Sequence, residues 1–150
     1  MTDHGRVLPR LEHIGIVVGD LAAAKAFFAE LGLAVEGEMT VEGRVVDRIN
    51  GLDGVRSDIA IMRTPDGHGK LELIRYRTPA APPGDPEAPA NTPGIRHILF
   101  EVADIDGVLD RLRPHGAELV GEVAQYEDSY RLCYVRGPAG IIVELAEKIG

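Results

Sequence analysis

The chain carries the same pattern twice, and this repeat limits its possible folds more than any other feature. The stretch "RLEHIGIVVGDLAAAKAFFAELGLAVEGE" (10–38) matches "GIRHILFEVADIDGVLDRLRPHGAELVGE" (94–122) without a gap, at a constant offset of 84 residues (97 − 13). The offset pairs His13 with His97 and Asp20 with Asp104. Self-similarity at a fixed offset indicates a duplicated supersecondary unit. Because 150 residues suit one compact domain, the two units are expected to share one interior.

Each copy predicts a strand, a helix and then further strands. In the first copy a β-branched run precedes Asp20, a predicted helix N-cap, and Gly32 is placed to end the helix. Asp104 and Gly116 repeat these signals in the second copy. Strand-like segments follow both helices, at 33–39, 43–49, 55–64 and 69–76 in the first copy and at 117–123, 130–137 and 140–147 in the second. Each unit is therefore roughly β-α-β-β-β.

The expected organisation is a single α+β domain built from two modules. Module one spans 8–77 and module two spans 94–147, and residues 78–93 between them carry six of the ten prolines. Such a proline-rich segment is typical of a semi-stiff linker without regular structure.

Composition and charge narrow the functional classes. Hydrophobic residues make up 45% and charged residues 27%, as in ordinary soluble proteins, and no apolar run approaches the length of a membrane span. A net charge of −8 disfavours nucleic acid and anionic membranes, so a small molecule or a protein is the expected partner. The N-terminus lacks the apolar segment of a signal peptide, which predicts a cytoplasmic location. Cys133, the one cysteine, excludes an internal disulfide and is interpreted as a packing residue.

Two of the five histidines stand out by position. His4 falls in an expected loose tail, His68 in a turn and His115 in the last turn of a helix, which gives each an ordinary explanation. By contrast, His13 and His97 occupy matching positions on the first strand of each copy. Strand alternation places both on the sheet face that points away from the helix.

Near its end, each copy has one glutamate among aliphatic residues: Glu72 in "KLELI" and Glu144 in "IIVELA". A carboxylate in such surroundings is costly unless it is paired, protonated or bound to a cation. A single strand histidine or glutamate is more often structural, but four at matched places favour a metal site. Two imidazoles and two carboxylates suit a divalent ion such as Zn, Ni, Co, Mn or Fe.

At these residues the chain resembles the vicinal oxygen chelate superfamily, which includes glyoxalase I, methylmalonyl-CoA epimerase, extradiol dioxygenases and bleomycin-resistance-type binding proteins. The resemblance runs from "LEHIGIVVGDL" to "GPAGIIVEL". It implies two tandem βαβββ modules that form an open, barrel-like cup, the glyoxalase/bleomycin resistance/dioxygenase fold. It also implies a metal bound by the first and last strands of each module, with His13 and Glu72 from module one and His97 and Glu144 from module two. A homodimer is expected as well, because two-module chains of this family commonly pair.

Three activities fit the resemblance. The first is a glyoxalase-I-like or epimerase-like lyase or isomerase that acts on a small molecule with adjacent oxygens through a metal-stabilised enediolate, with Glu144, or else Glu72, as the base. The second is a metal-free protein that binds a drug or natural product. The third is an extradiol dioxygenase using His13, His97 and Glu144, although Glu72 would then occupy a position that oxygen needs.

Substrate contacts are predicted from "QYEDSYRLCY" and from an arginine-rich region. Tyr126, Tyr130 and Tyr134 would line an aromatic pocket, or else belong to a hairpin with two surface tyrosines and one core tyrosine. Arg48 is the candidate for an anionic group. An equally good interpretation is that Arg48 and its neighbours, Arg44, Arg75 and Arg77, are ordinary strand arginines exposed to solvent.

Overall fold

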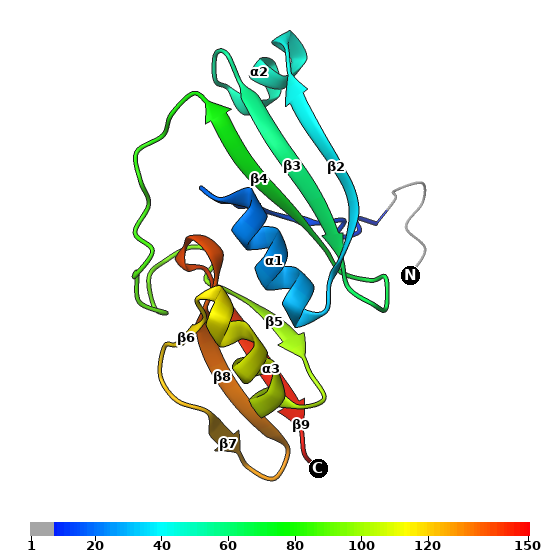
Figure 1. Cartoon of the computed structure of the whole chain (residues 1–150), viewed down its shortest axis with the longest axis vertical. Coiled ribbons are helices and arrows are strands. Elements are labelled where there is room, and N and C mark those ends of the chain that lie inside the picture. Colours follow the sequence, from blue (N-terminus) through cyan, green and yellow to red (C-terminus); the bar gives the residue numbers. More distant parts are fainter. Residues whose placement is uncertain (1–7) are drawn as a thin grey trace.

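The computed structural model describes residues 8–150 and contains two separate β-sheets with helices packed against them. Figure 1 shows the sheets one above the other, with the two longest helices lying in front of them. No strand of one sheet is hydrogen bonded to a strand of the other among the described residues, so the sheets do not close into a barrel. No helix in residues 8–150 is long and apolar enough to cross a membrane.

The first sheet belongs to module one and has the strand order β1-β4-β3-β2. Its strands are β1 (Ile14–Val17), β2 (Ala34–Glu42), β3 (Arg56–Arg63) and β4 (Lys70–Thr78). β1 runs parallel to β4, whereas the β2–β3 and β3–β4 pairs are antiparallel. The helix between β1 and β2 carries the chain from one edge of the sheet to the other, and β1 lies beside the last strand of the module, β4.

The second sheet repeats this plan with the strand order β5-β9-β8-β6. Its strands are β5 (His97–Glu101), β6 (Glu118–Leu119), β8 (Tyr130–Arg136) and β9 (Ile142–Lys148), and β7 (Ala124–Tyr126) pairs with β8 beyond the end of β6. β5 is parallel to β9 and β8 is antiparallel to it. The strand predicted at 117–123 is therefore only two residues long, and the following segment forms the separate strand β7.

The predicted helix signals are confirmed. In α1 (Leu21–Leu31) the Asp20 side chain accepts a hydrogen bond from the Ala23 N–H at 3.0 Å, and Gly32 ends the helix with φ 123°. In α3 (Ile105–Leu112) Asp104 accepts from the Gly107 N–H at 3.1 Å. This helix continues as a 3-10 turn, η1 (Arg113–His115), so that Gly116 ends the turn and not the α-helix itself.

Both modules contribute to one core, as the repeat predicts. α1 and α3 contact each other, and their apolar stripes meet the inner faces of both sheets. Phe28 of α1 lies 6.4 Å, ring centroid to ring centroid, from Phe100 of β5. Cys133 is buried in this core, and burial raises the pKa of its thiol, in agreement with a packing role.

The strand predicted at 43–49 is wrong, because this segment forms the helix α2 (Arg44–Asn50). The Asp47 carboxylate accepts hydrogen bonds from the N–H groups of Gly54 and Val55 at 2.9 and 2.7 Å, and Gly51 ends the helix in the left-handed region with φ 67°. β2 and β3 pair up to Glu42 and Arg56, so residues 43–49 lie in the connection between these two strands. Tertiary hydrogen bonds therefore override the β propensity of the two valines.

No helix or strand lies between Thr78 and His97, as predicted for the linker, but this segment is tied to module two. Arg96 donates to the carbonyls of Ala88 and Pro89 at 3.0 and 3.2 Å, and Arg136 donates to the carbonyl of Glu87 at 3.2 Å. His68 lies in the turn between β3 and β4 and His115 lies in η1, close to their predicted places. His4 and the first residues of the N-terminus lie outside the described residues.

Candidate metal and substrate site

The first predicted pair of ligands is in contact. His13 directly precedes β1, and its Nε2 lies 3.1 Å from Oε2 of Glu72 on β4. The parallel pairing of β1 with β4 sets Gly15 beside Glu72 and so brings the two side chains to the same end of the two strands. Their side chains are 38% and 22% exposed, which leaves the pair accessible to a ligand from solvent.

The second pair repeats this contact in module two. Nε2 of His97, the first residue of β5, lies 3.3 Å from Oε1 of Glu144 on β9. The Glu144 side chain is only 13% exposed and stands opposite Leu99 on one side and Tyr134 on the other. The His97 ring also lies against the Tyr134 ring, with centroids 5.1 Å apart.

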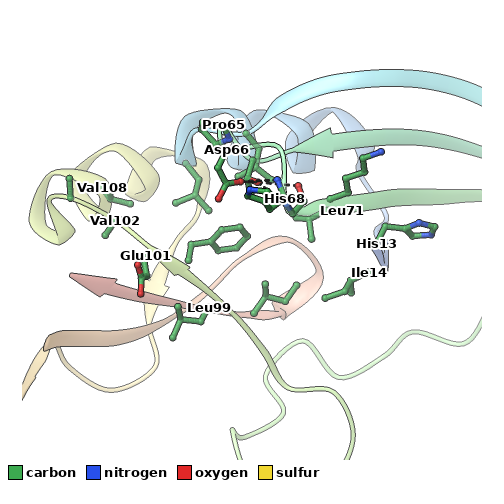
Figure 2. A pocket seen from close by; sticks show the side chains of 18 of the residues that line it. His13, Ile14, Pro65, Asp66, His68, Leu71, Leu99, Glu101, Val102 and Val108 are labelled. Atoms are coloured by element: carbon green, nitrogen blue, oxygen red, sulfur yellow. Dashed lines mark hydrogen bonds between the residues drawn. The ribbon is translucent and has the colours of Figure 1, made fainter. Parts of the chain in front are cut away.

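The two pairs do not meet within one chain. No group of three or more His, Cys, Asp or Glu side chains in residues 8–150 is arranged to hold a metal ion. His13 lines a cavity of about 810 Å³ bounded by β1, the β3–β4 turn, β5 and α3, and Figure 2 shows His13 and Glu101 at different parts of its wall. His97 lines a second cavity, of about 780 Å³, beside the linker.

Each pair lies on what we call the open face of its sheet, the face opposite the helices. The core-facing residues of β1 and β5 point the other way: Ile16 is buried, and Ile98 and Phe100 pack against the core. On the open faces Val17 is 56%, Met39 49% and Leu99 46% exposed. Apolar side chains beside two polar pairs are typical of a surface that binds another molecule.

The three predicted tyrosines lie on the open face of the second sheet. Tyr126 pairs across the strands with Tyr130, and Tyr130 and Tyr134 are four residues apart on β8, so strand alternation keeps all three on the face of Glu144. Tyr126 is exposed, and Tyr130 and Tyr134 are half-buried. None of the three is a core residue.

The arginines considered for an anionic group lie in two different environments. Arg75 and Arg77 contact Asp58 at 3.7 and 2.7 Å, and they occupy the alternate positions of β4, away from the open face. The hydrogen bond from Arg77 holds the pKa of Asp58 below its ordinary value. Arg48 is exposed on α2, at the end of the first sheet far from the second sheet (Figure 1), and contacts none of the four ligand candidates.

Glu12, a residue beside the site, was not predicted from the sequence. Oε1 of Glu12 accepts a hydrogen bond from Nδ1 of His13 at 3.3 Å, on the opposite side of the ring from Glu72. This hydrogen bond, together with the charge of Lys70, whose Nζ lies 3.7 Å from Glu12 Oε2, holds the pKa of Glu12 below its ordinary value. The signal was available in "LEHIG", where a carboxylate directly precedes the candidate ligand.

Two relatives match almost the whole chain. A glyoxalase family protein from Bacillus cereus, known from a crystal structure, is 47% identical, with 99% of this chain and 100% of that chain covered and a TM-score of 0.93. The uncharacterized protein YaeR of Escherichia coli strain K12 is 29% identical over 142 residues, which cover 94% of this chain and 98% of that protein.

More distant structures share the fold alone. The trypanothione-dependent glyoxalase I of Leishmania major is 20% identical, with a TM-score of 0.63 and 93% of this chain and 87% of that chain covered. TnmS3, an antibiotic binding protein from Streptomyces sp. CB03234, is 17% identical, with a TM-score of 0.60 and 95% and 98% covered. One fold therefore serves both an enzyme and a binding protein.

The family model that matches residues 10–145 spans both modules and all four candidate ligands. Together with the duplicated βαβββ plan and the relative from Bacillus cereus, this match identifies the family. The chain belongs to the Glyoxalase/Bleomycin resistance protein/Dioxygenase superfamily.

Proposed function

We propose that the protein is a metal-dependent lyase or isomerase of the glyoxalase I or epimerase type, acting on a small molecule with adjacent oxygens. The observation that carries this proposal is the presence of two His–Glu contacts, at 3.1 and 3.3 Å, at matching positions of the two sheets. The glyoxalase I of Leishmania major has the same fold, which supports the reaction class by analogy.

The donor set fits a divalent ion. Each pair offers one imidazole nitrogen and one carboxylate oxygen, and two such pairs give four ligands of the kind that Zn, Ni, Co, Mn or Fe accept. The residues that would hold the ion are His13, Glu72, His97 and Glu144. A bound ion supplies Lewis-acid stabilisation of the negative charge that develops on a substrate oxygen.

A second copy of the chain would complete this set. In one chain His13 and His97 line different cavities, and the apolar side chains of Val17, Met39 and Leu99 on the open faces are about half exposed. We therefore propose a homodimer in which module one of each subunit faces module two of its partner. Each site would then take His13 and Glu72 from one subunit and His97 and Glu144 from the partner subunit.

Glu144 is the proposed base. Its carboxylate is the less exposed of the two, at 13% against 22% for Glu72, and Leu99 and Tyr134 flank it on the neighbouring strands. Such a carboxylate can accept a proton from the carbon next to a substrate carbonyl and return it to a neighbouring position. His97 would orient the carboxylate through their 3.3 Å contact.

A subunit-mixing experiment tests the site and its arrangement together. His13→Ala and His97→Ala chains with different affinity tags are co-expressed, and the mixed dimer is purified through both tags. In the proposed arrangement one site of the mixed dimer carries both substitutions and the other carries neither. We therefore expect about half of the wild-type metal content by elemental analysis, whereas each variant homodimer holds almost none.

Other outcomes of this experiment would contradict parts of the proposal. A mixed dimer without metal, beside a wild type that holds one ion per chain, would place all four ligands of each site in one chain. A monomeric mass by light scattering would contradict the homodimer. A wild type that takes up no ion under any metal supplementation would overturn the enzyme proposal itself.

A second candidate function is the sequestration of an aromatic compound, favoured by the three tyrosines on one open face. The chain has four tyrosines and no tryptophan, so its fluorescence reports mainly on this face. If His13→Ala and Glu144→Gln variants bind a planar aromatic compound as tightly as wild type, judged by tyrosine quenching, and no hemithioacetal or 2-acyl-CoA thioester is converted, sequestration is the better account.

A further inference from the structure

The His13 ring lies between two carboxylates. Its Nε2 faces Glu72 Oε2 at 3.1 Å, and its Nδ1 faces Glu12 Oε1 at 3.3 Å. The ring therefore has one nitrogen directed to a candidate metal ligand and the other directed to a group outside the ligand set.

Glu12 is itself held in place by cations. Nζ of Lys70, at the start of β4, lies 3.7 Å from Glu12 Oε2, and Nη2 of Arg10 also lies 3.7 Å from this oxygen. Lys70 also lies 3.4 Å from Glu36 Oε1 on β2. Because β4 carries both Lys70 and Glu72, the strand that supplies one candidate ligand also anchors the carboxylate behind the other.

Module two has no counterpart of Glu12. The repeat offset places Arg96 at this position, and its guanidinium is directed to the linker carbonyls of Ala88 and Pro89. His97 is supported instead by the ring of Tyr134. Among residues 8–150, a carboxylate behind the histidine is thus found in module one alone.

A histidine that binds a metal through one nitrogen commonly donates its other N–H to a carboxylate. This hydrogen bond fixes the ring orientation, decides which nitrogen is free to bind and increases the basicity of that nitrogen. We propose that Glu12 positions the His13 imidazole in this way, accepting the Nδ1–H and leaving Nε2 as the metal-binding nitrogen. The proposal rests on the metal site proposed above.

Calorimetric titration with Zn²⁺ or Ni²⁺ measures the effect on metal affinity. We expect Glu12→Ala to raise the dissociation constant about 10–100-fold, the usual effect of losing such a supporting carboxylate. Glu12→Gln keeps an oxygen that accepts the Nδ1–H and is expected to recover part of the affinity. Glu36→Gln is the matched control, because it removes a carboxylate from the same lysine without touching His13, and it should change the constant less than about twofold.

A measurement on the metal-free protein separates this proposal from the metal site. In metal-free Glu72→Ala only Glu12 still faces the ring, so the ¹⁵N shifts of His13 should report the Nδ1–H tautomer. Adding Glu12→Ala should shift the population toward Nε2–H, whereas adding Glu36→Gln should not. Unchanged ¹⁵N shifts on loss of Glu12, or equal weakening by Glu12→Ala and Glu36→Gln, would overturn the proposal. A wild type without metal affinity but with the expected tautomer change would contradict the proposed function and leave Glu12 as the residue that orients His13.

Discussion

The two modules share a backbone plan and a His–Glu contact, yet they surround the contact differently. In module one His13 lies between two carboxylates, in a sheet whose open face is largely aliphatic. In module two His97 lies between Glu144 and an aromatic ring, on a face that carries three tyrosines. The difference suggests a division of labour, in which module one holds an ion firmly and module two presents the base and the substrate surface.

The largest effect is expected from a change at Glu144. Glu144→Gln is expected to lower kcat by about 10²–10⁴-fold, because an amide keeps a coordinating oxygen but accepts no proton near neutral pH. Glu72→Gln, the matched change in module one, should lower kcat much less. The measurement is turnover of a thiol hemithioacetal or a 2-acyl-CoA thioester at saturating metal. Equal losses for both variants would remove the proposed division of labour.

A core truncation tests whether the modules fold as one unit. Phe28→Ala is expected to lower the free energy of unfolding by about 3–5 kcal/mol, because Phe28 is fully buried and contacts Phe100 of the other module. The loss should appear in a single denaturant transition detected by circular dichroism and by tyrosine fluorescence. Two separated transitions would show that each module has a core of its own.

The helix N-caps allow a finer comparison. Asp20→Ala should lower the free energy of unfolding by about 1 kcal/mol, because it removes the acceptor for the Ala23 N–H. Asp104→Ala should lower the free energy of unfolding by less. Here Glu147 of β9 accepts a second hydrogen bond in the first turn of α3, from the Ile105 N–H at 2.8 Å, and this bond remains in the variant. Chemical denaturation of both variants measures this difference. A larger loss for Asp104→Ala would contradict the supporting role of Glu147.

The smallest expected effect concerns an ion pair that joins α3 to β8 in module two. Arg131 donates to both oxygens of Asp106, at 2.8 and 3.2 Å, and this hydrogen bonding holds the pKa of Asp106 below its ordinary value of 3.8. A lowered pKa stabilises the fold above the unfolded-state value and loses this contribution as pH falls through the folded-state value. Asp106→Asn should therefore lower Tm slightly at pH 7, and the difference from wild type should shrink as pH falls below about 4. A difference that stays constant down to pH 2 would exclude the ion pair as its cause.

Much of the fold could be predicted from the sequence because its signals are local. Asp20 and Asp104 begin their helices by capping them, and Gly32 ends the first because it adopts a positive φ. Alternation placed His13 and His97 opposite the helices. The strand predicted at 43–49 was wrong because the β propensity of its valines is local, whereas Asp47 accepts hydrogen bonds from backbone groups seven and eight residues away that the pattern does not encode.

The repeat by itself determined the modular plan, the caps, the apolar stripes and the matching positions of His13 and His97. Those properties depend on residue type and on spacing along the chain. Only the tertiary structure decided that His13 and His97 line separate cavities in one chain, that Arg75 and Arg77 pair with Asp58, and that Glu12 stands behind His13. These features depend on how the sheets lie relative to each other and on which long side chains meet across strands, and the linear pattern encodes neither.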